Sequence, residues 1–516
     1  MVIDGVAARC ARRFQQLVQH DLHAFRAVLV QHRGPRLRTF DLRQGDSRRR
    51  LHLRVHSDGS AVLMVDVTEA IHLNPAAALL VEAALDGVPE KQAIVRLQRR
   101  FRLPSRAEAE QAVTKMYTLV ARLNDTSSAC PTCGLLEADR SAWFTLPVAA
   151  PYKADLALTY GCNNACSHCY NRRLEEASPR SALLERQWRL VLRRLGRIGV
   201  PHVVFTGGEP TLCEFLPALI AQAARLGLVA GLNTNGRRLA DRGFAGALRI
   251  AGLDHVQITL ESHRPEVHNA MTRAASFDET VAGLKNALRV GLHTLTNTTL
   301  TRRNIGHVGE LMDFLHQQGL RTFAMNGMIY SGNGCTTEDA LPVESLAPVL
   351  SDIRDRAARL GMRFLWYTPT EYCRLSPLEL DLGPRRCNAA EYSICIEPNG
   401  DVLPCQSYYV SAGNILRDSW PEIWESQLFR SIRHRLDEPA GLPPRCVQCP
   451  DRSLCAGGCP LEREHLLRQR GGRVPLSLED GRISSCDDPA GATAYDRVEV
   501  SGTGPLRPSR FPGGAS

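Results

Sequence analysis

The chain has 516 residues, a formal net charge of +9 and a composition that is 44% hydrophobic and 23% charged. That length exceeds one ordinary core and predicts two to four domains. No apolar run approaches the roughly 18 residues that a membrane span needs, which argues against a membrane protein. The first residues lack the continuous apolar stretch of a secretory signal, so a cytoplasmic protein is expected.

Residues 1–50 are predicted to form an irregular basic segment with one helix around residues 8–30. Residues 1–60 carry 12 Arg or Lys against 5 Asp or Glu. Such a basic face binds nucleic acid, binds an acidic peptide or is simply solvated. The solvated surface is the favoured interpretation, and a nucleic-acid partner is not expected.

Residues 51–125 are predicted to form a small domain. Residues 58–72 are typical of two short strands joined by a polar turn at 66–69. Asn74 is suited to cap the helix that Pro75 opens, and helical spacing of apolar residues continues through 76–86, 90–101 and 106–123. A linker over 126–152 follows, in which an incidental pair of Cys130 and Cys133 is favoured over a metal site.

Alternating β and helical segments begin near residue 155. The predicted strands are 155–160, 202–205, 229–233, 255–260, 294–300 and 322–328, and the predicted helices are 180–198, 214–226, 277–290 and 305–318. Repeated β-α units indicate a parallel sheet, so an α/β fold with an open, partial β/α barrel of six units is expected over 153–335.

Beyond the barrel the helical and strand periodicity weakens. Residues 336–384 are predicted to connect the barrel to a cysteine-rich domain over 385–490. Metal clusters organise such regions more often than a large apolar core does. The remainder, 491–516, is rich in Gly, Pro and Ser and is predicted to be disordered.

Three cysteines, Cys162, Cys166 and Cys169, lie within eight residues on the loop that leaves the first barrel strand. Thiolates at this spacing can bind three irons of an iron–sulfur cubane. The missing fourth ligand would leave one iron open. By spacing alone, a structural zinc site or buried thiols remain alternatives.

Residues that follow the other barrel strands favour an iron–sulfur cluster over a zinc site or buried thiols. The next strand is followed by Thr206-Gly207-Gly208-Glu209-Pro210, and later strands end at Asn233-Thr234-Asn235-Gly236 and Thr259-Leu260-Glu261. The carboxyl ends of parallel strands share one rim, where β/α barrels place their chemistry. Glycine backbone and a carboxylate are therefore expected beside the open iron.

The CxxxCxxC motif followed by GGEP resembles the radical S-adenosylmethionine superfamily over about 155–330. The resemblance implies that Cys162, Cys166 and Cys169 bind a [4Fe–4S] cluster whose open iron chelates S-adenosylmethionine. It implies further that Gly207, Gly208 and Glu209 hold the methionyl amino end. Thr259 and Arg273 would approach its carboxylate or ribose, although Thr259-Leu260-Glu261-Ser262 departs from the family's usual Ser-Leu-Asp-Gly and Arg273 stands farther along than usual. Reductive cleavage would yield methionine and a 5′-deoxyadenosyl radical.

A second array holds seven cysteines: Cys387, Cys405, Cys446, Cys449, Cys455, Cys459 and Cys486. By spacing alone it fits zinc as well as iron. The complete string resembles the SPASM extension of radical S-adenosylmethionine enzymes over about 385–490, which implies two auxiliary [4Fe–4S] clusters. One would use Cys446, Cys449, Cys455 and Cys486. The other would use Cys387, Cys405 and Cys459, with Cys373 as fourth ligand or an open site.

Other residues near the array carry weaker expectations. Cys395 lies in an apolar, strand-like stretch and is predicted to be a core thiol. Asp381, Glu391 and Tyr392 are candidate proton acceptors that nothing in the sequence ranks, so the general base and the catalytic residues stay unassigned.

Residues 50–125 resemble the PqqD-like peptide-chaperone domain of the pyrroloquinoline quinone pathway, most clearly over 69–87. The resemblance implies capture of a precursor-peptide leader as an added strand; a structural or dimerising domain is the alternative. The favoured function is a radical maturase that cross-links or oxidises a ribosomally made peptide or protein. An external donor such as a flavodoxin or ferredoxin would supply electrons. A small-molecule substrate such as a tetrapyrrole, a sulfatase-maturating oxidase, and a non-catalytic electron-transfer protein are the alternatives.

Overall fold

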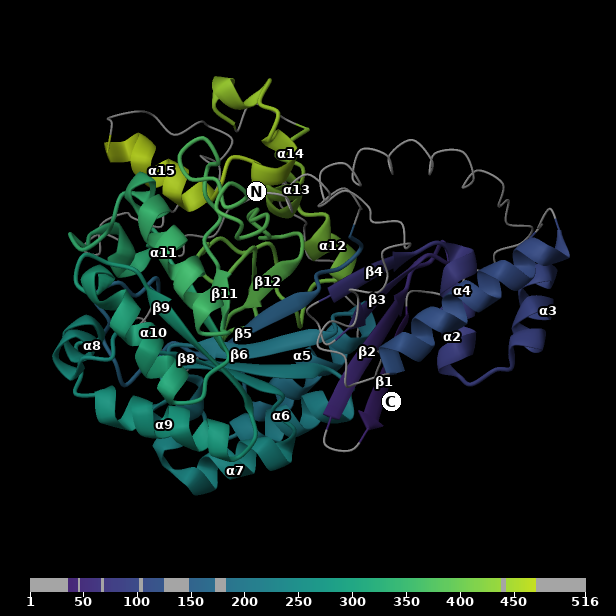
Figure 1. The fold of residues 1–516 in the computed structure, drawn as a ribbon, viewed down its shortest axis with the longest axis horizontal. Coiled ribbons are helices and arrows are strands. Elements are labelled where there is room, and N and C mark those ends of the chain that lie inside the picture. Colours follow the sequence, from purple (N-terminus) through teal and green to yellow (C-terminus); the bar gives the residue numbers. More distant parts are fainter. Residues whose placement is uncertain are drawn as a thin grey trace, which may run out of the picture.

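A computed structural model describes residues 36–44, 47–65, 69–101, 105–124, 148–171, 182–437 and 442–469. The expected helix at 8–30, the centre of the turn at 66–69, most of the linker with Cys130 and Cys133, Cys486 and the predicted tail lie outside these residues. Figure 1 shows a small N-terminal domain beside a larger body that contains the parallel sheet and the cysteine-rich region.

The N-terminal domain is a four-stranded antiparallel sheet followed by three helices. Its elements are β1 (Arg36–Gln44), β2 (Ser47–Val55), β3 (Ala61–Val65), β4 (Glu69–Leu73), α2 (Pro75–Leu85), α3 (Glu90–Arg100) and α4 (Arg106–Asn124). The Asn74 side chain caps α2 as predicted, accepting a hydrogen bond of 2.8 Å from the Ala77 amide. The two predicted strands and three predicted helices are confirmed.

Strand β1 and the first residues of β2 lie in the segment predicted to be irregular, and the sheet therefore begins well before residue 50. Leu51 and Leu53 of β2 pack into the domain's own core. Arg50, His52 and Arg54 alternate with them and point to the other face, where they are 8%, 0% and 1% exposed. The favoured solvated surface is wrong for these residues, because the barrel covers that face of β2.

The N-terminal domain docks on loops that precede barrel strands. Arg50 makes a two-pronged ion pair with Asp254, with N–O distances of 2.9 and 3.0 Å. The His52 ring nitrogen Nε2 lies 2.8 Å from the Gly227 carbonyl oxygen. Gly227 and Asp254 precede strands β7 and β8. The domain therefore contacts the amino-terminal ends of the parallel strands, whereas the cysteine loop lies at their carboxyl ends.

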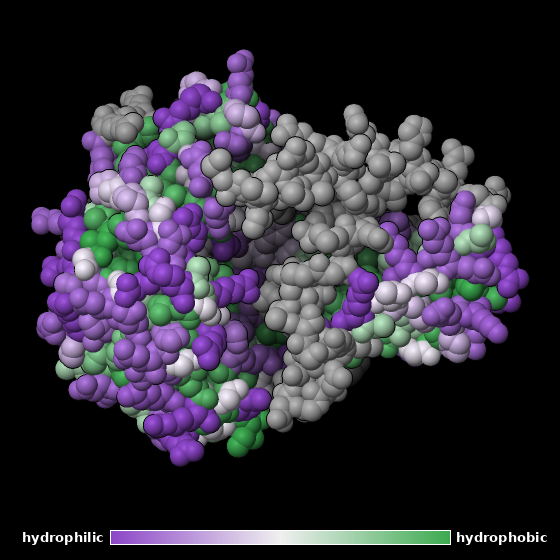
Figure 2. All heavy atoms as spheres, viewed as in Figure 1, coloured by the Kyte–Doolittle hydropathy of each residue, from purple (hydrophilic) through white to green (hydrophobic). Residues whose placement is uncertain are grey.

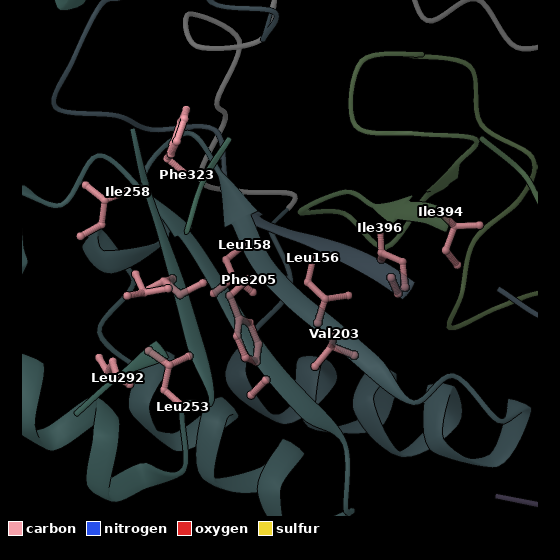
Figure 3. Packing of buried hydrophobic residues seen from close by; sticks show 14 of the residues in the cluster. Leu156, Leu158, Val203, Phe205, Leu253, Ile258, Leu292, Phe323, Ile394 and Ile396 are labelled. Atoms are coloured by element: carbon pink, nitrogen blue, oxygen red, sulfur yellow. The ribbon is translucent and has the colours of Figure 1, made fainter. Parts of the chain in front are cut away.

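The six parallel strands and the four predicted helices occur in the predicted order, and the α/β class is confirmed. Two further helices, over 242–251 and 265–272, were not predicted. The elements are β5 (Lys153–Thr159), α5 (Glu185–Ile198), β6 (His202–Gly207), α6 (Leu216–Arg225), β7 (Val229–Thr234), α7 (Arg242–Ala251), β8 (His255–Thr259), α8 (Pro265–Thr272), α9 (Phe277–Arg289), β9 (His293–Thr299), α10 (Val308–Gln317) and β10 (Thr322–Asn326). Each strand pairs in parallel with its successor. Apolar side chains from β5, β6 and β8, among them Leu156, Phe205 and Ile258, pack beneath the strands (Figure 3).

The sheet continues past the six predicted strands on both sides. The predicted connecting segment contributes α11 (Leu346–Arg359) and β11 (Arg363–Trp366), which pairs in parallel with β10. At the other end β12 (Ser393–Ile396) pairs in parallel with β5, followed by β13 (Val402–Leu403). Cys395 is 1% exposed within β12, as expected of a core thiol.

The cysteine-rich region is joined to the barrel through this shared sheet. Its short helices are α12 (Trp420–Trp424), α13 (Gln427–Arg433), α14 (Arg452–Cys455) and α15 (Pro460–Gln469). No helix in the described part of the chain is long and apolar enough to cross a bilayer. The visible face of the larger body is mostly hydrophilic, with scattered apolar residues (Figure 2).

Candidate active site at the carboxyl rim of the barrel

The three motif cysteines converge on the loop that follows β5. A negative charge on Cys162 or on Cys169 would act on the Cys166 thiol, which stands between them on this loop. Burial, reinforced by these charges, raises the pKa of Cys166 well above its usual value. Burial also raises the pKa of Cys169 to about 11. Protonated thiols are the stable form here without a cation, and bound iron would favour the thiolates.

Neighbouring segments hold the backbone of this loop on two sides. Asn333 donates from its amide to the Cys169 carbonyl (2.8 Å) and from its side chain to the Cys166 carbonyl (3.0 Å). On the other side the Ser167 amide donates to the Met271 carbonyl (2.9 Å) at the end of α8. The cysteines are therefore fixed in a loop whose hydrogen bonds are satisfied by the rest of the barrel.

His168 is a site residue that the sequence analysis did not single out. It stands between two motif cysteines, and its Nε2 lies 2.9 Å from Oε1 of Glu261, which is fully buried at the end of β8. The other Glu261 oxygen accepts from the Thr299 amide (2.9 Å). Burial alone would lower the pKa of His168, but the Glu261 carboxylate outweighs it and raises that pKa. In the sequence, two features could have indicated this pair: a histidine inside the cysteine motif and a glutamate just after a barrel strand.

Gly207 and Gly208 lie directly against the strand that leads into the cysteine loop. A side chain on Gly207, whose φ is +131°, would put Cβ 2.1 Å from the Thr159 carbonyl oxygen. On Gly208 it would lie 2.3 Å from the Gly161 carbonyl oxygen. The Gly208 and Glu209 amides donate to these same two carbonyls, at 2.7 and 2.8 Å. Only glycine allows this close approach of two backbones.

The Glu209 carboxylate, which follows β6, accepts hydrogen bonds from the end of β7. It is 1% exposed. Oε1 accepts from the Thr211 amide and hydroxyl and from the Thr234 hydroxyl, and Oε2 accepts from the Asn235 amide at 2.8 Å. Burial raises the pKa of Glu209, although these hydrogen bonds oppose that effect. Oε2 accepts one hydrogen bond among the described residues, and a carboxylate oxygen has two lone pairs, so the expected role of Glu209 at the methionyl amino end stays a prediction.

Thr259 and Arg273 lie near the same rim. Thr259 ends β8 opposite Asn297 of β9, and the Asn297 oxygen Oδ1 is buried without a hydrogen-bond partner among the described residues. Arg273 follows the two residues of α8 that bind the cysteine loop, has φ 51°, and is exposed. An unmet polar atom beside Thr259 fits a site that receives a polar ligand.

The downstream cysteines form two groups. Charges at Cys387 and Cys405 act on Cys459, and burial raises the pKa of Cys459 as well as that of Cys405, which reaches about 12. In the second group, charge at Cys455 acts on Cys446, and the pKa of both is raised chiefly by burial. The division of these cysteines between two clusters stays a prediction, since Cys486 lies outside the described residues.

Cys373 lies with the second group. Its charge acts on both Cys446 and Cys455. The neighbouring Tyr372 amide donates to the Cys455 sulfur (3.3 Å). As a fourth ligand for the cluster of Cys387, Cys405 and Cys459, Cys373 is thus poorly placed, and of the two expected alternatives the open site is favoured.

The donor sets fit iron–sulfur clusters. In the described ranges no three His, Cys, Asp or Glu side chains are placed to hold a single metal ion. The thiols nevertheless lie in groups, on one loop for Cys162, Cys166 and Cys169 and in the cysteine-rich region for the others, and thiolate is the ligand that iron–sulfur clusters require. Cys449 begins the turn before α14, where its amide lies 3.4 Å from the Cys446 carbonyl oxygen.

The candidate proton acceptors have other partners. Asp381 is exposed and lies 3.6 Å from Arg354. Glu391 is buried in an ion pair with Arg386. Burial raises the pKa of Tyr392, so its hydroxyl is protonated at neutral pH. The structure does not rank these residues as bases.

Comparisons with known proteins agree with this site. The model of the Radical SAM superfamily matches residues 156–315, and that of the SPASM iron–sulfur cluster-binding domain matches 387–450. The PqqA peptide cyclase of Streptomyces rochei is 30% identical over 325 residues, covering 60% of this chain and 85% of that protein. The mycofactocin maturase MftC of Mycobacterium tuberculosis is 30% identical over 323 residues, covering 60% and 78%.

Two further proteins are similar to this chain, one in sequence and one in fold. The Fe-coproporphyrin III synthase of Methanosarcina barkeri is 25% identical over 324 residues, covering 58% of this chain and 81% of that protein. The crystal structure of Streptococcus suis SuiB bound to precursor peptide SuiA has a TM-score of 0.61 and 17% identity, and covers 87% of this chain and 100% of that one. That likeness shows a shared fold.

The cysteine loop, the glycine contacts and the family matches lead to one conclusion. The chain belongs to the radical SAM superfamily and carries a SPASM domain, so it is an enzyme that uses S-adenosylmethionine and [4Fe–4S] clusters.

Proposed function

We propose that this enzyme modifies a ribosomally made peptide or protein, forming a cross-link or oxidising a residue. The observation that carries the proposal is the similarity over most of the length of two relatives named as a peptide cyclase and a maturase. The fold shared with SuiB, which was solved with a precursor peptide, supports it over 87% of this chain.

The N-terminal domain is proposed to act as a PqqD-like recognition domain. In the described sheet β4 pairs with β3 alone, so its other edge offers backbone groups to a further strand. Helix α2 follows β4 directly. A leader peptide that adds to β4 would gain main-chain hydrogen bonds there, the mode called β-augmentation.

The site residues divide the work of the reaction. When bound, the cluster of Cys162, Cys166 and Cys169 supplies the electron that cleaves S-adenosylmethionine. The His168–Glu261 pair fixes the loop that bears these cysteines, while Gly207 and Gly208 let the neighbouring strand approach it. A reduced flavodoxin or ferredoxin is the proposed external donor.

The proposal is tested with anaerobically reconstituted protein, dithionite, S-adenosylmethionine and the peptide encoded beside the gene. Release of 5′-deoxyadenosine and a peptide mass lower by two hydrogens are expected, and Cys166→Ala should abolish both. Peptide modification that continues unchanged after residues 36–124 are deleted would refute leader capture by the N-terminal domain.

A tetrapyrrole substrate is the second candidate, favoured by the similarity to the Fe-coproporphyrin III synthase. Turnover of an iron porphyrin with no turnover of the peptide would replace the first proposal with this one.

A further inference from the structure

A cleft of about 660 Å³ lies where the N-terminal domain, the barrel and the cysteine-rich region meet. Its walls include Arg54 of β2, five residues of α5 and Trp420 of α12; the α5 residues are Leu190, Arg193, Arg194, Arg197 and Ile198. Cavities of this size enclose whole ligands or several side chains. The cleft lies on the outer side of α5, away from the cysteine loop at the barrel rim.

Arg54 brings a buried positive charge to this cleft. It is 1% exposed, and its Nη1 donates to the carbonyls of Ala150 and Pro151 at 2.9 and 3.1 Å. Its Nε and Nη2 are buried, and the neighbouring side chain is Tyr152, which interacts with the guanidinium and whose ring centroid lies 4.7 Å from it. Burial lowers the pKa of Arg54 to about 10, so the group stays charged at neutral pH. Buried charges are usually paired, which favours a ligand that supplies acceptors.

Two further arginines bring positive charge to the cleft. Arg193 and Arg197, one turn apart on α5, are exposed and make no ion pair within the described part of the chain. Arg194 donates to the carbonyls of Ile415 and Asp418, which fastens α5 to the cysteine-rich region.

The walls combine this positive charge with apolar surface. No acidic side chain among the described residues lines the cleft. Leu190, one turn before Arg193 and Arg194 on α5, also lines the cleft and has 46% of its area exposed. Arginines match carboxylates in charge and in the geometry of their donors, and exposed leucine beside them favours a partner with both acidic and apolar side chains over a simple anion.

We propose that this cleft binds an acidic, apolar segment of the polypeptide substrate, as a docking site separate from the β4 edge and from the reaction site. The inference rests on the proposed peptide substrate. A segment held here contacts all three domains at once, so it anchors the substrate to the assembled enzyme.

The test measures binding of a fluorescein-labelled twelve-residue peptide of Glu, Leu and Gly to the full-length holoenzyme by fluorescence anisotropy. Arg193→Glu with Arg197→Glu should weaken binding about tenfold. A matched pair on α7, Arg242→Glu with Arg249→Glu, changes net charge equally at two exposed positions and should leave affinity within about twofold. The same peptide with Gln in place of Glu should bind as weakly to the unaltered enzyme as the acidic peptide binds to the α5 variant.

A cross-linking experiment locates the peptide. A photoreactive p-benzoylphenylalanine replacing Leu190 should capture the acidic peptide. Equal affinity for the α5 and α7 variants, capture of the chain's own residues 125–147 in place of the peptide, or competition by inorganic phosphate as effective as by the peptide would each overturn the inference. Release of 5′-deoxyadenosine without peptide should be unchanged in the α5 variant, so a failure of the docking site is distinguished from loss of the radical reaction.

Discussion

Glu209 shows at the scale of one residue how the rim is held. Its two carboxylate oxygens accept four hydrogen bonds, and those from the Thr234 hydroxyl and the Asn235 amide join the end of β6 to the end of β7. Glu209→Gln keeps the shape but turns an amide donor toward other donors. Leaving a buried group unpaired costs about 1–3 kcal/mol, so a lower thermal midpoint is expected, measured by circular dichroism on protein of equal iron content.

Glu214→Gln is the matched control. Glu214 lies five residues after Glu209 on the same loop, and its side chain is exposed. That change should leave the thermal midpoint unaltered. Equal midpoints for the two variants would contradict the bracing role of Glu209.

Residue types alone led to a wrong prediction for the arginines of β2. Arg50 and Arg54 suggested a solvated basic surface, yet both are buried against barrel carbonyls and Asp254. A strand with one apolar face and one arginine-bearing face has the same pattern whether that second face meets water or another domain. The covering domain is far away in the chain, so only the folded structure identifies it.

Gly208 belongs to the scale of elements, because it sets the distance between β6 and the loop after β5. Gly208→Ala would put Cβ 2.3 Å from the Gly161 carbonyl oxygen, so the loop must shift. A displacement of about 1 Å at a reacting site costs on the order of 100-fold in rate. A loss of that order in 5′-deoxyadenosine release is expected.

Gly246→Ala controls for the substitution itself. Gly246 lies inside α7, and no other residue comes within 4 Å of the position that an added methyl group would take. Alanine there should stabilise the helix by about 0.5–1 kcal/mol. Unchanged 5′-deoxyadenosine release from the Gly208 variant would show that the strand and loop tolerate a wider spacing.

Most elements of the barrel were predictable, for a physical reason. The six strands from β5 to β10 are short apolar runs between amphipathic helices, which local pattern reveals. Strands β1, β2 and β11 were missed because arginine-rich or very short segments carry little such pattern. The motif cysteines were found from spacing, whereas the His168–Glu261 contact joins positions 93 residues apart and needs the fold.

At the scale of the whole molecule, buried histidines lie between the N-terminal domain and the barrel. His52 lies against the Gly227 carbonyl, and in the adjoining barrel strands the Nε2 atoms of His202 and His255 are 2.8 Å apart. Burial lowers the pKa of both His52 and His255 to about 4. The nearby charges of Arg50, Lys153 and His293 add to this effect.

These pKa values predict that acid weakens the folded protein. Histidine in the unfolded chain has a pKa of about 6.5, so between about pH 6.5 and 4 the unfolded state binds more protons. Stability is therefore constant above this window and falls as the pH is lowered through it, by about 2 kcal/mol for each such histidine at pH 5. His52→Gln keeps a donor toward Gly227 and removes one titrating group, so its thermal midpoint should fall less between pH 7.5 and 5.0. His434→Gln, at an exposed position, should match the unaltered protein at both pH values; an equal fall in all three proteins would contradict this origin of acid sensitivity.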